Sequence, residues 1–244
     1  MPSLPPGQSI SVVFPAYQEE ALLPTAVGDV VAGLRSWKVT FEVLVVENGS
    51  TDRTREVSES LAVEHPEVRA LSVASADYGK ALREGLLQAT GTYVANFDVD
   101  LYDLHFLEAA IARMAADGGP SIIVATKRGE GAVDTRHWTR RVVTGVFSMM
   151  LKVGFGLKVS DTHGMKVMRR GDVVDTARRC LFGTDLFDTE LVLRTERAGL
   201  LTDEIGVTIE EKRPARTPIV GRIARSLRGL GTLWLALRRE KRVS

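Results

Sequence analysis

Short apolar runs alternate with segments of helical periodicity along the first half of the chain. In the longer segments apolar side chains recur every three to four residues, as at Val27, Val30, Val31 and Leu34, which is typical of a helix with one buried face. The short runs are rich in β-branched residues and favour buried strands. The pattern therefore predicts strands at 10–14, 41–46, 68–73, 93–97 and 121–125, and helices at 19–37, 51–61, 80–89 and 104–116.

Strands that alternate with helices predict an α/β, Rossmann-like fold, with a mostly parallel central sheet covered by helices on both faces. Its ligands are expected beyond the carboxyl ends of the strands. The second half is less regular. There the pattern predicts helices at 136–155, 187–198 and 220–239 and strands at 165–168 and 205–209. We expect one domain over residues 1–218, followed by a basic amphipathic helix within 219–244.

Composition and charge narrow the picture. The 244 residues are 44% hydrophobic, enough for a sizeable core, and the single cysteine, Cys180, excludes an intramolecular disulfide. No signal peptide and no apolar stretch of membrane-spanning length are evident, so we expect a cytoplasmic location. Residues 212–244 carry a net charge of +9 although the whole chain carries +1, which indicates an anionic partner for the tail.

A pair of acids, Asp98 and Asp100, follows the predicted strand at 93–97. Two carboxylates that converge there can bind one divalent cation, and oxygen ligands suit Mg²⁺ or Mn²⁺. Such a cation also binds a diphosphate and stabilises the charge on a leaving nucleoside diphosphate. The alternative is a solvated turn between strand and loop.

Two more polar segments end predicted strands, at 14–20 (FPAYQEE) and 46–52 (VENGSTD). Each has a structural alternative: a proline turn before a helix in the first case, and a strand-to-helix turn with an N-cap in the second. Because the three segments end three strands of one sheet, they could line one crevice.

These segments, with DYGKALREG at 77–85, occur in the order and approximate spacing of the family 2 glycosyltransferases, which residues 9–105 resemble. That family has the GT-A fold. The resemblance implies that Asp98 and Asp100 hold the metal. It also implies nucleotide-sugar contacts from Pro15, Ala16, Tyr17, Glu19, Glu47, Asn48, Asp52, Lys80, Asp98, Val99 and Asp100.

Three positions depart from the family's pattern. Glu47-Asn48 stands where paired aspartates are common, which obscures the preferred base. Asp77 replaces a common asparagine. Tyr102 replaces a glutamine two residues after the metal pair, which leaves a third metal ligand unassigned.

The second half resembles the dolichol- or polyprenol-phosphate hexose (mannose) synthases at Lys127-Arg128, 140–144 and 160–166. The resemblance implies that Arg128, Arg140, Thr144 and Arg213 bind the phosphate of a polyprenyl phosphate lipid. It implies inverting transfer of mannose or glucose from a GDP- or UDP-linked sugar, with Asp98, Asp100, Arg128 and Arg213 at the catalytic centre. Arginine offers paired donors to phosphate oxygens, and a phosphate monoester is ionised near neutral pH, so it needs no strong base.

Two other functions stay open. A transferase to a sugar hydroxyl would need a carboxylate base, for which Asp188 and Glu190 are candidates, although both also fit the acidic start of a helix. The third possibility is a non-catalytic module that binds a nucleotide sugar. Nothing in the sequence indicates a nucleic-acid partner.

The segment 220–239 places Ile223, Leu227, Leu230, Trp234 and Leu237 at helical spacing among arginines. This pattern is typical of an interfacial helix on an anionic membrane and predicts peripheral association with the inner face of the cell membrane. The alternative is a terminal helix that packs on the domain and leaves its basic side in water.

Overall fold

Seven strands form one mixed sheet in a computed structural model that describes residues 4, 7–126, 149, 153–159, 162, 164–183, 186–207 and 229–238. The order across the sheet is β3-β2-β1-β4-β6-β5-β7. Only β6 runs antiparallel to its neighbours β4 and β5, and the other pairs are parallel. The strands are β1 (Ser9–Ala16), β2 (Thr40–Asn48), β3 (Val68–Val73), β4 (Tyr93–Asn96), β5 (Ile122–Thr126), β6 (Lys166–Arg169) and β7 (Thr202–Gly206).

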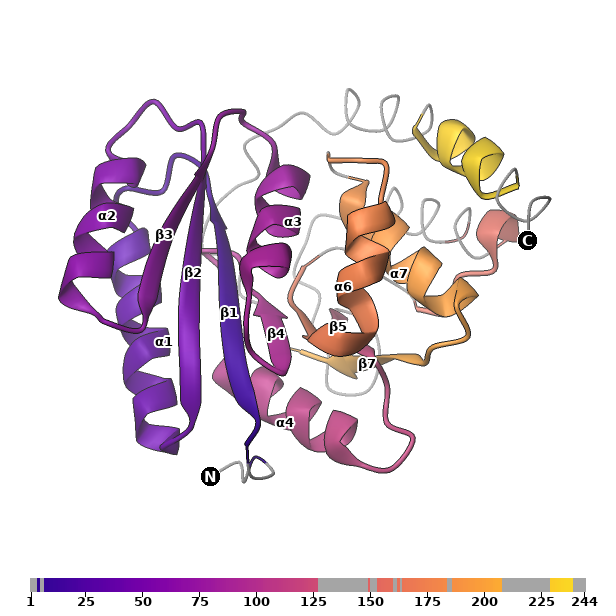
Figure 1. Ribbon diagram of the computed structural model, residues 1–244, viewed down its shortest axis with the longest axis horizontal. Helices are drawn as coiled ribbons and strands as arrows, with labels where there is room; N and C mark the ends of the chain where they lie inside the picture. The colour runs from indigo at the N-terminus through magenta and orange to yellow at the C-terminus, as the bar shows by residue number, and fades with distance from the viewer. Residues whose placement is uncertain are drawn as a thin grey trace.

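Helices cover both faces of this sheet, as predicted (Figure 1). On one face, α1, α2 and α4 pack on side chains such as Val12 and Phe14 of β1. On the other face, α3, α6 and α7 pack on alternate side chains such as Val13. The helices are α1 (Leu23–Trp37), α2 (Thr54–Glu64), α3 (Tyr78–Gln88), α4 (Leu104–Ala115), α6 (Arg170–Arg179) and α7 (Phe187–Arg197). Burial on both faces explains why the central strands are continuous apolar runs in the sequence.

The observed elements differ from the predicted ones at four places, and one of these is α2, which lies at Thr54–Glu64, three residues later than predicted at both ends. Helix α1 begins at Leu23, four residues later than predicted, because residues 19–22 form a turn before Pro24 in the first helical turn. Helix α6 was not predicted, because only four of its ten residues are buried and its sequence is strongly polar. Strand β7 lies at Thr202–Gly206, three residues earlier than predicted.

Residues 229–238 form a helix near the C-terminus (Figure 1). Leu230, Leu233 and Leu237 are buried in the core on the α3, α6 and α7 side of the sheet. Trp234 lies under the guanidinium of Arg238, 3.5 Å from the ring centroid, while Leu235 is exposed. In the described part, the predicted amphipathic helix therefore uses its leucine face for packing. None of the described helices is long and apolar enough to cross a bilayer.

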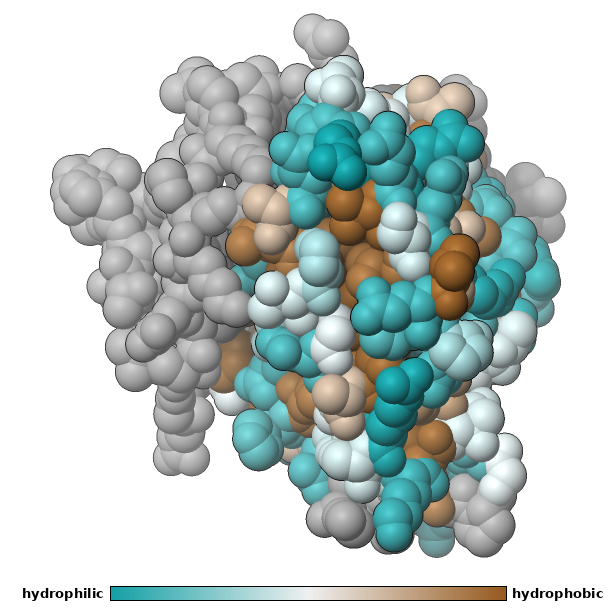
Figure 2. Space-filling view, turned by 90° about the vertical axis from the view of Figure 1, so that its left-hand side faces the viewer, coloured by the Kyte–Doolittle hydropathy of each residue, from teal (hydrophilic) through white to brown (hydrophobic). Residues whose placement is uncertain are grey.

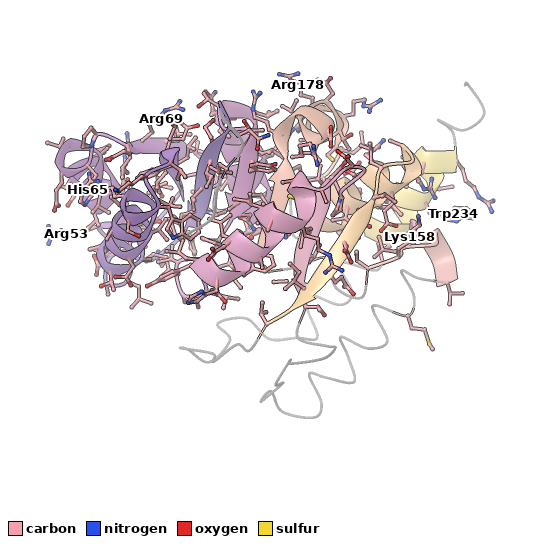
Figure 3. The ribbon with its side chains drawn as sticks, turned by 90° about the horizontal axis from the view of Figure 1, so that it is seen from below. Arg53, His65, Arg69, Lys158, Arg178 and Trp234 are labelled. Atoms are coloured by element: carbon pink, nitrogen blue, oxygen red, sulfur yellow. The ribbon has the colours of Figure 1, made fainter. Side chains whose placement is uncertain are left out.

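Residues labelled in Figure 3 mark two opposite ends of the molecule. Arg53 and His65 mark the end formed by α2, whereas Lys158 and Trp234 lie at the opposite end (Figure 3). Over α1, α2 and β3 hydrophilic residues are interspersed with hydrophobic ones (Figure 2). Exposed apolar side chains occur both on α2, at Val63, and on the helix at 229–238, at Leu235.

Candidate active site

Asp98 and Asp100 lie in a tight turn directly after β4. The Asp98 amide donates to the Leu101 carbonyl at 3.0 Å, and the Leu101 amide donates back to the Asp98 carbonyl at 2.9 Å. Val99, between the two acids, is buried in the core. The turn therefore anchors its apolar residue inward and leaves both aspartates partly exposed at the carboxyl edge of the sheet.

The Asp98 carboxylate lies in a crowded, charged environment. Burial raises its pKa from 3.8 to about 6; Lys166 opposes this shift, whereas the charges of Asp100 and Asp188 add to it. Tyr78 also forms a hydrogen bond with Asp98, and burial together with the charges of Asp98 and Asp188 raises the pKa of Tyr78 well above its ordinary value. Carboxylates that lie close together repel one another, and their oxygen atoms are the ligands that a divalent cation such as Mg²⁺ prefers. A bound cation would remove this repulsion.

The described residues contain no group of three or more His, Cys, Asp or Glu side chains placed to hold a metal. Asp98 and Asp100 could thus supply two ligands. Tyr102, at the position where a third ligand was in question, donates its hydroxyl to Asp29 of α1 at 2.7 Å and packs edge-on against Phe14. Substrate or water oxygens are then the natural source of further ligands.

Hydrogen bonds between backbone amides and side chains join the loops after β1 and β2. Gln18 and Glu19 donate backbone N–H groups to the Ser50 and Thr54 hydroxyls at 3.1 and 2.7 Å. The Arg53 amide donates to the Glu20 carboxylate at 2.9 Å. Gln18 adopts a left-handed backbone conformation with φ 59°, which a non-glycine residue holds only where its surroundings enforce it. The two polar segments predicted to meet therefore do meet.

Three predicted nucleotide-binding residues at or just after the end of β2 form hydrogen bonds in this region. Glu47 is buried and accepts hydrogen bonds from the Ser50 amide and, at 2.9 Å, from the Ser72 hydroxyl. The Asn48 side-chain amide lies between the Ala16 carbonyl and the Asp77 amide. Burial alone would raise the pKa of Asp52, but hydrogen bonds from Thr54 and from the Glu20 amide lower it below its usual value.

Tyr17 is more exposed than these three residues. At this edge of the sheet 41% of its surface is exposed, beside the buried Pro15 and Ala16. It is the large aromatic side chain at this edge that could stack on a nucleoside base. Glu19 is partly exposed next to it.

Asp77 is the N-cap of α3. Its carboxylate accepts hydrogen bonds from the Gly79 and Lys80 amides at 3.1 and 3.4 Å. Aspartate and asparagine are equally good N-caps, so this departure from the family pattern is explained by local structure. Lys80 is exposed, donates to the Ser75 hydroxyl at 3.2 Å and lies 3.9 Å from the Asp77 carboxylate.

The structure places Asp188 and Glu190 inside the protein. Asp188 is 2% exposed and its carboxylate lies 3.1 Å from the ammonium of Lys166, which is fully buried. Glu190 accepts hydrogen bonds from the Leu181 and Phe182 amides at 2.8 and 2.9 Å and from Arg194 at 2.7 Å. Glu190 is thus a structural anchor for the segment before α7. Both candidate bases therefore already have ion-pair or hydrogen-bond partners inside the protein.

Sequence reasoning did not find Lys166 as part of this site. The available signal was a lone charged residue within the apolar run Met165-Lys166-Val167-Met168, which a buried strand does not accommodate without a partner. The predicted acceptor residues Arg128, Arg140, Thr144 and Arg213 lie outside the described residues, as do Asp161 and His163.

A mostly parallel sheet with polar loops and an acidic pair at its carboxyl edge defines an α/β protein whose ligands are expected at that edge. The sequence model for "Glycosyl transferase family 2" matches residues 11–176, so the chain belongs to this family. The fold is that of glucosyl-3-phosphoglycerate synthase from Mycobacterium tuberculosis, solved with Mn²⁺, UDP and phosphoglyceric acid. That likeness has a TM-score of 0.69 and 21% identity, covering 94% of this chain and 78% of the other.

Two curated relatives extend over most of the chain. An uncharacterised glycosyltransferase of Mycobacterium tuberculosis is 28% identical over 229 residues, which cover 93% of this chain and 97% of the relative. A dolichyl-phosphate β-glucosyltransferase of Drosophila melanogaster is 29% identical over 222 residues, which cover 83% of this chain and 67% of the relative. The chain is therefore a family 2 transferase whose acceptor these similarities leave open.

Proposed function

We propose that the protein is a metal-dependent hexosyltransferase that transfers mannose or glucose, with inversion, from a GDP- or UDP-linked sugar to polyprenyl phosphate. The proposal rests mainly on the partners that the two candidate bases, Asp188 and Glu190, already have in the folded protein. Asp188 is buried in an ion pair with Lys166, and Glu190 accepts three hydrogen bonds. An acceptor hydroxyl needs a base, whereas a phosphate monoester is already ionised and reacts without one.

The donor half of this proposal draws on the carboxyl edge of the sheet. Asp98 and Asp100 would hold Mg²⁺ or Mn²⁺, which would stabilise the negative charge on the leaving nucleoside diphosphate. Tyr17 would stack on the base, and the exposed Lys80 would approach the donor phosphates. Glu47, Asn48 and Asp52 would act by shaping the loops around the nucleoside. The solved neighbour bound to UDP and Mn²⁺ supports this arrangement.

The acceptor half rests on the four residues Arg128, Arg140, Thr144 and Arg213, which would bind the lipid phosphate by charge-assisted hydrogen bonds. The dolichyl-phosphate β-glucosyltransferase relative supports a lipid acceptor. The enzyme would mainly bring two phosphate-bearing substrates together and stabilise the leaving group. Peripheral binding to the inner face of an anionic membrane would give access to the lipid.

A second candidate is transfer to a small soluble acceptor. It is favoured by the solved neighbour, whose acceptor is phosphoglyceric acid. A non-catalytic module is a weaker candidate, because the acidic pair is intact and its charges are held close together.

The test is transfer of radiolabelled sugar from GDP-mannose and UDP-glucose, with Mn²⁺ or Mg²⁺, to polyprenyl phosphate or to phosphoglyceric acid. The proposal predicts metal-dependent label in the organic phase. Label in phosphoglyceric acid would establish the second candidate instead. Absence of label from the lipid with every nucleotide sugar would overturn the proposal.

A further inference from the structure

Lys166 is a charged side chain placed in the interior of the sheet. Its strand, β6, lies between β4 and β5, and Lys166 is directly opposite Asn96 on β4 and Val124 on β5. The side chain is 0% exposed. A buried ammonium is costly unless it is paired and hydrogen-bonded, so its partners indicate what it does.

Those partners come from two separate segments. The Lys166 ammonium lies 3.1 Å from Oδ1 of Asp188 in the first turn of α7. It also donates to the backbone carbonyls of Thr162 and Gly164 at 3.2 and 2.8 Å. Beside it, the hydroxyls of Thr162 and Thr189 are 2.9 Å apart. We call Lys166, Asp188, Thr162 and Thr189 the α7 clasp, because together they join the segment before β6 to the start of α7.

The α7 clasp lies next to the metal pair. Asn96, opposite Lys166, is followed two residues later by Asp98, and the Asn96 amide donates to the Tyr78 hydroxyl at 3.0 Å. Lys166 and Asp188 both act electrostatically on Asp98. Lys166 thus links α7, through Asp188, to the strand that leads into the Asp98–Asp100 turn, where it lies opposite Asn96.

We propose that Lys166 is a positioning residue for the transfer reaction, which holds α7, Thr162 and Gly164 in place against the Asp98–Asp100 turn. This inference rests on the proposed transferase function but not on which acceptor is used. Lys166 need not touch either substrate. Its ammonium fixes the relative position of two elements, and a displacement of about 1 Å at a reacting centre lowers turnover up to roughly 100-fold.

The test is a double-mutant cycle with the variants K166M, D188N and K166M/D188N. The matched control is R69M, E42Q and R69M/E42Q, because Arg69 and Glu42 form an ion pair at 2.8 Å at the opposite end of the sheet from the candidate active site. We expect K166M and D188N each to lower kcat by about tenfold or more, with the double variant no worse than either single one. KM for the nucleotide sugar should stay within about threefold, and the control pair should keep kcat within about threefold.

A second readout does not depend on turnover. Amide hydrogen exchange of the metal-free protein should be faster at residues 98–101 and 164–167 in K166M/D188N than in wild type, and unchanged there in R69M/E42Q. Replacement of both partners of a buried pair is commonly tolerated, so the double variants are expected to fold.

Two results would overturn the proposal. If D188N lost far more activity than K166M, Asp188 would act on the substrate itself. If the control pair reduced kcat and speeded exchange at the same residues to the same extent, the clasp would contribute stability alone. Should wild type transfer no sugar to lipid, the cycle can be run with phosphoglyceric acid or with hydrolysis of the nucleotide sugar, so the two proposals fail separately.

Discussion

The Glu42 carboxylate on β2 accepts a hydrogen bond from the Ser11 hydroxyl on β1 at 2.7 Å. The same carboxylate accepts from the amide and hydroxyl of Thr90, both at 2.7 Å, and from Arg69 at 2.8 Å. One side chain thereby ties β1, β2, β3 and the turn before β4 together at the amino end of the sheet. This cluster lies at the opposite end of the strands from the candidate active site, so it can be perturbed without direct effect on chemistry.

We expect Glu42→Ala to destabilise the protein by about 1–3 kcal/mol, because four donors lose one acceptor. Burial alone would raise the pKa of Glu42, but the hydrogen bonds from Ser11, Thr90 and Arg69 lower it below 4.5. The stabilisation is therefore present above the unfolded-state pKa and is lost as pH falls through the folded-state value. Urea denaturation from pH 7 to pH 3 should show the difference between wild type and variant shrink towards low pH. A difference independent of pH would contradict this explanation.

The N-cap of α3 provides a second prediction. Asp77→Ala should cost about 1 kcal/mol, because the Gly79 and Lys80 amides lose their acceptor, whereas Asp77→Asn should be close to neutral. The effect is measured by denaturant midpoint. Since Lys80 lies in the first turn of this helix, KM for the nucleotide sugar should rise in the alanine variant alone. Equal losses in both variants would show that the charge of Asp77, not its capping, is what matters.

Asp98→Asn should have opposite effects on stability and activity. Because the pKa of Asp98 is raised to about 6, its stabilising contribution is complete below the unfolded value near 3.8 and is lost as pH rises through about 6. Without metal, wild type should therefore lose melting temperature relative to the variant between pH 4 and pH 7. Turnover should be abolished in Asp98→Asn.

Added Mn²⁺ provides the control for this prediction. It should raise the melting temperature of wild type at pH 7 and leave that of Asp98→Asn nearly unchanged, because only a bound cation stabilises the folded state. An equal rise in both proteins would place the metal elsewhere.

Membrane association depends on the exposed side of the helix at 229–238. Leu235→Glu should reduce cosedimentation with anionic vesicles, because it places a negative charge beside Trp234 and Arg238 on the side that is not packed. The matched control is Leu201→Glu, whose leucine is 53% exposed, against 54% for Leu235. If neither substitution changes pelleting, the described part of the helix serves packing and not lipid binding.

Much of the fold could be predicted because its signals are local. The central strands are buried on both faces and are therefore continuous apolar runs, and α1 and α4 keep helical periodicity. The acidic pair at Asp98 and Asp100 was recognisable because it directly follows such a strand. Helix α6 was missed because its polar sequence offers only a short apolar face, with Val173, Val174 and Ala177.

The sequence by itself determined the α/β class, the order of the first elements and the polar segments at the strand ends, since each depends on residues close together in the chain. Only the tertiary structure decided which polar groups are exposed and unburied, and so available to contact a substrate. It buried Glu47 and Glu190, turned Leu230, Leu233 and Leu237 inward, and paired Lys166 with Asp188, 22 positions away in the chain. Burial and ion pairing depend on neighbours contributed by other elements, and a local pattern does not specify those neighbours.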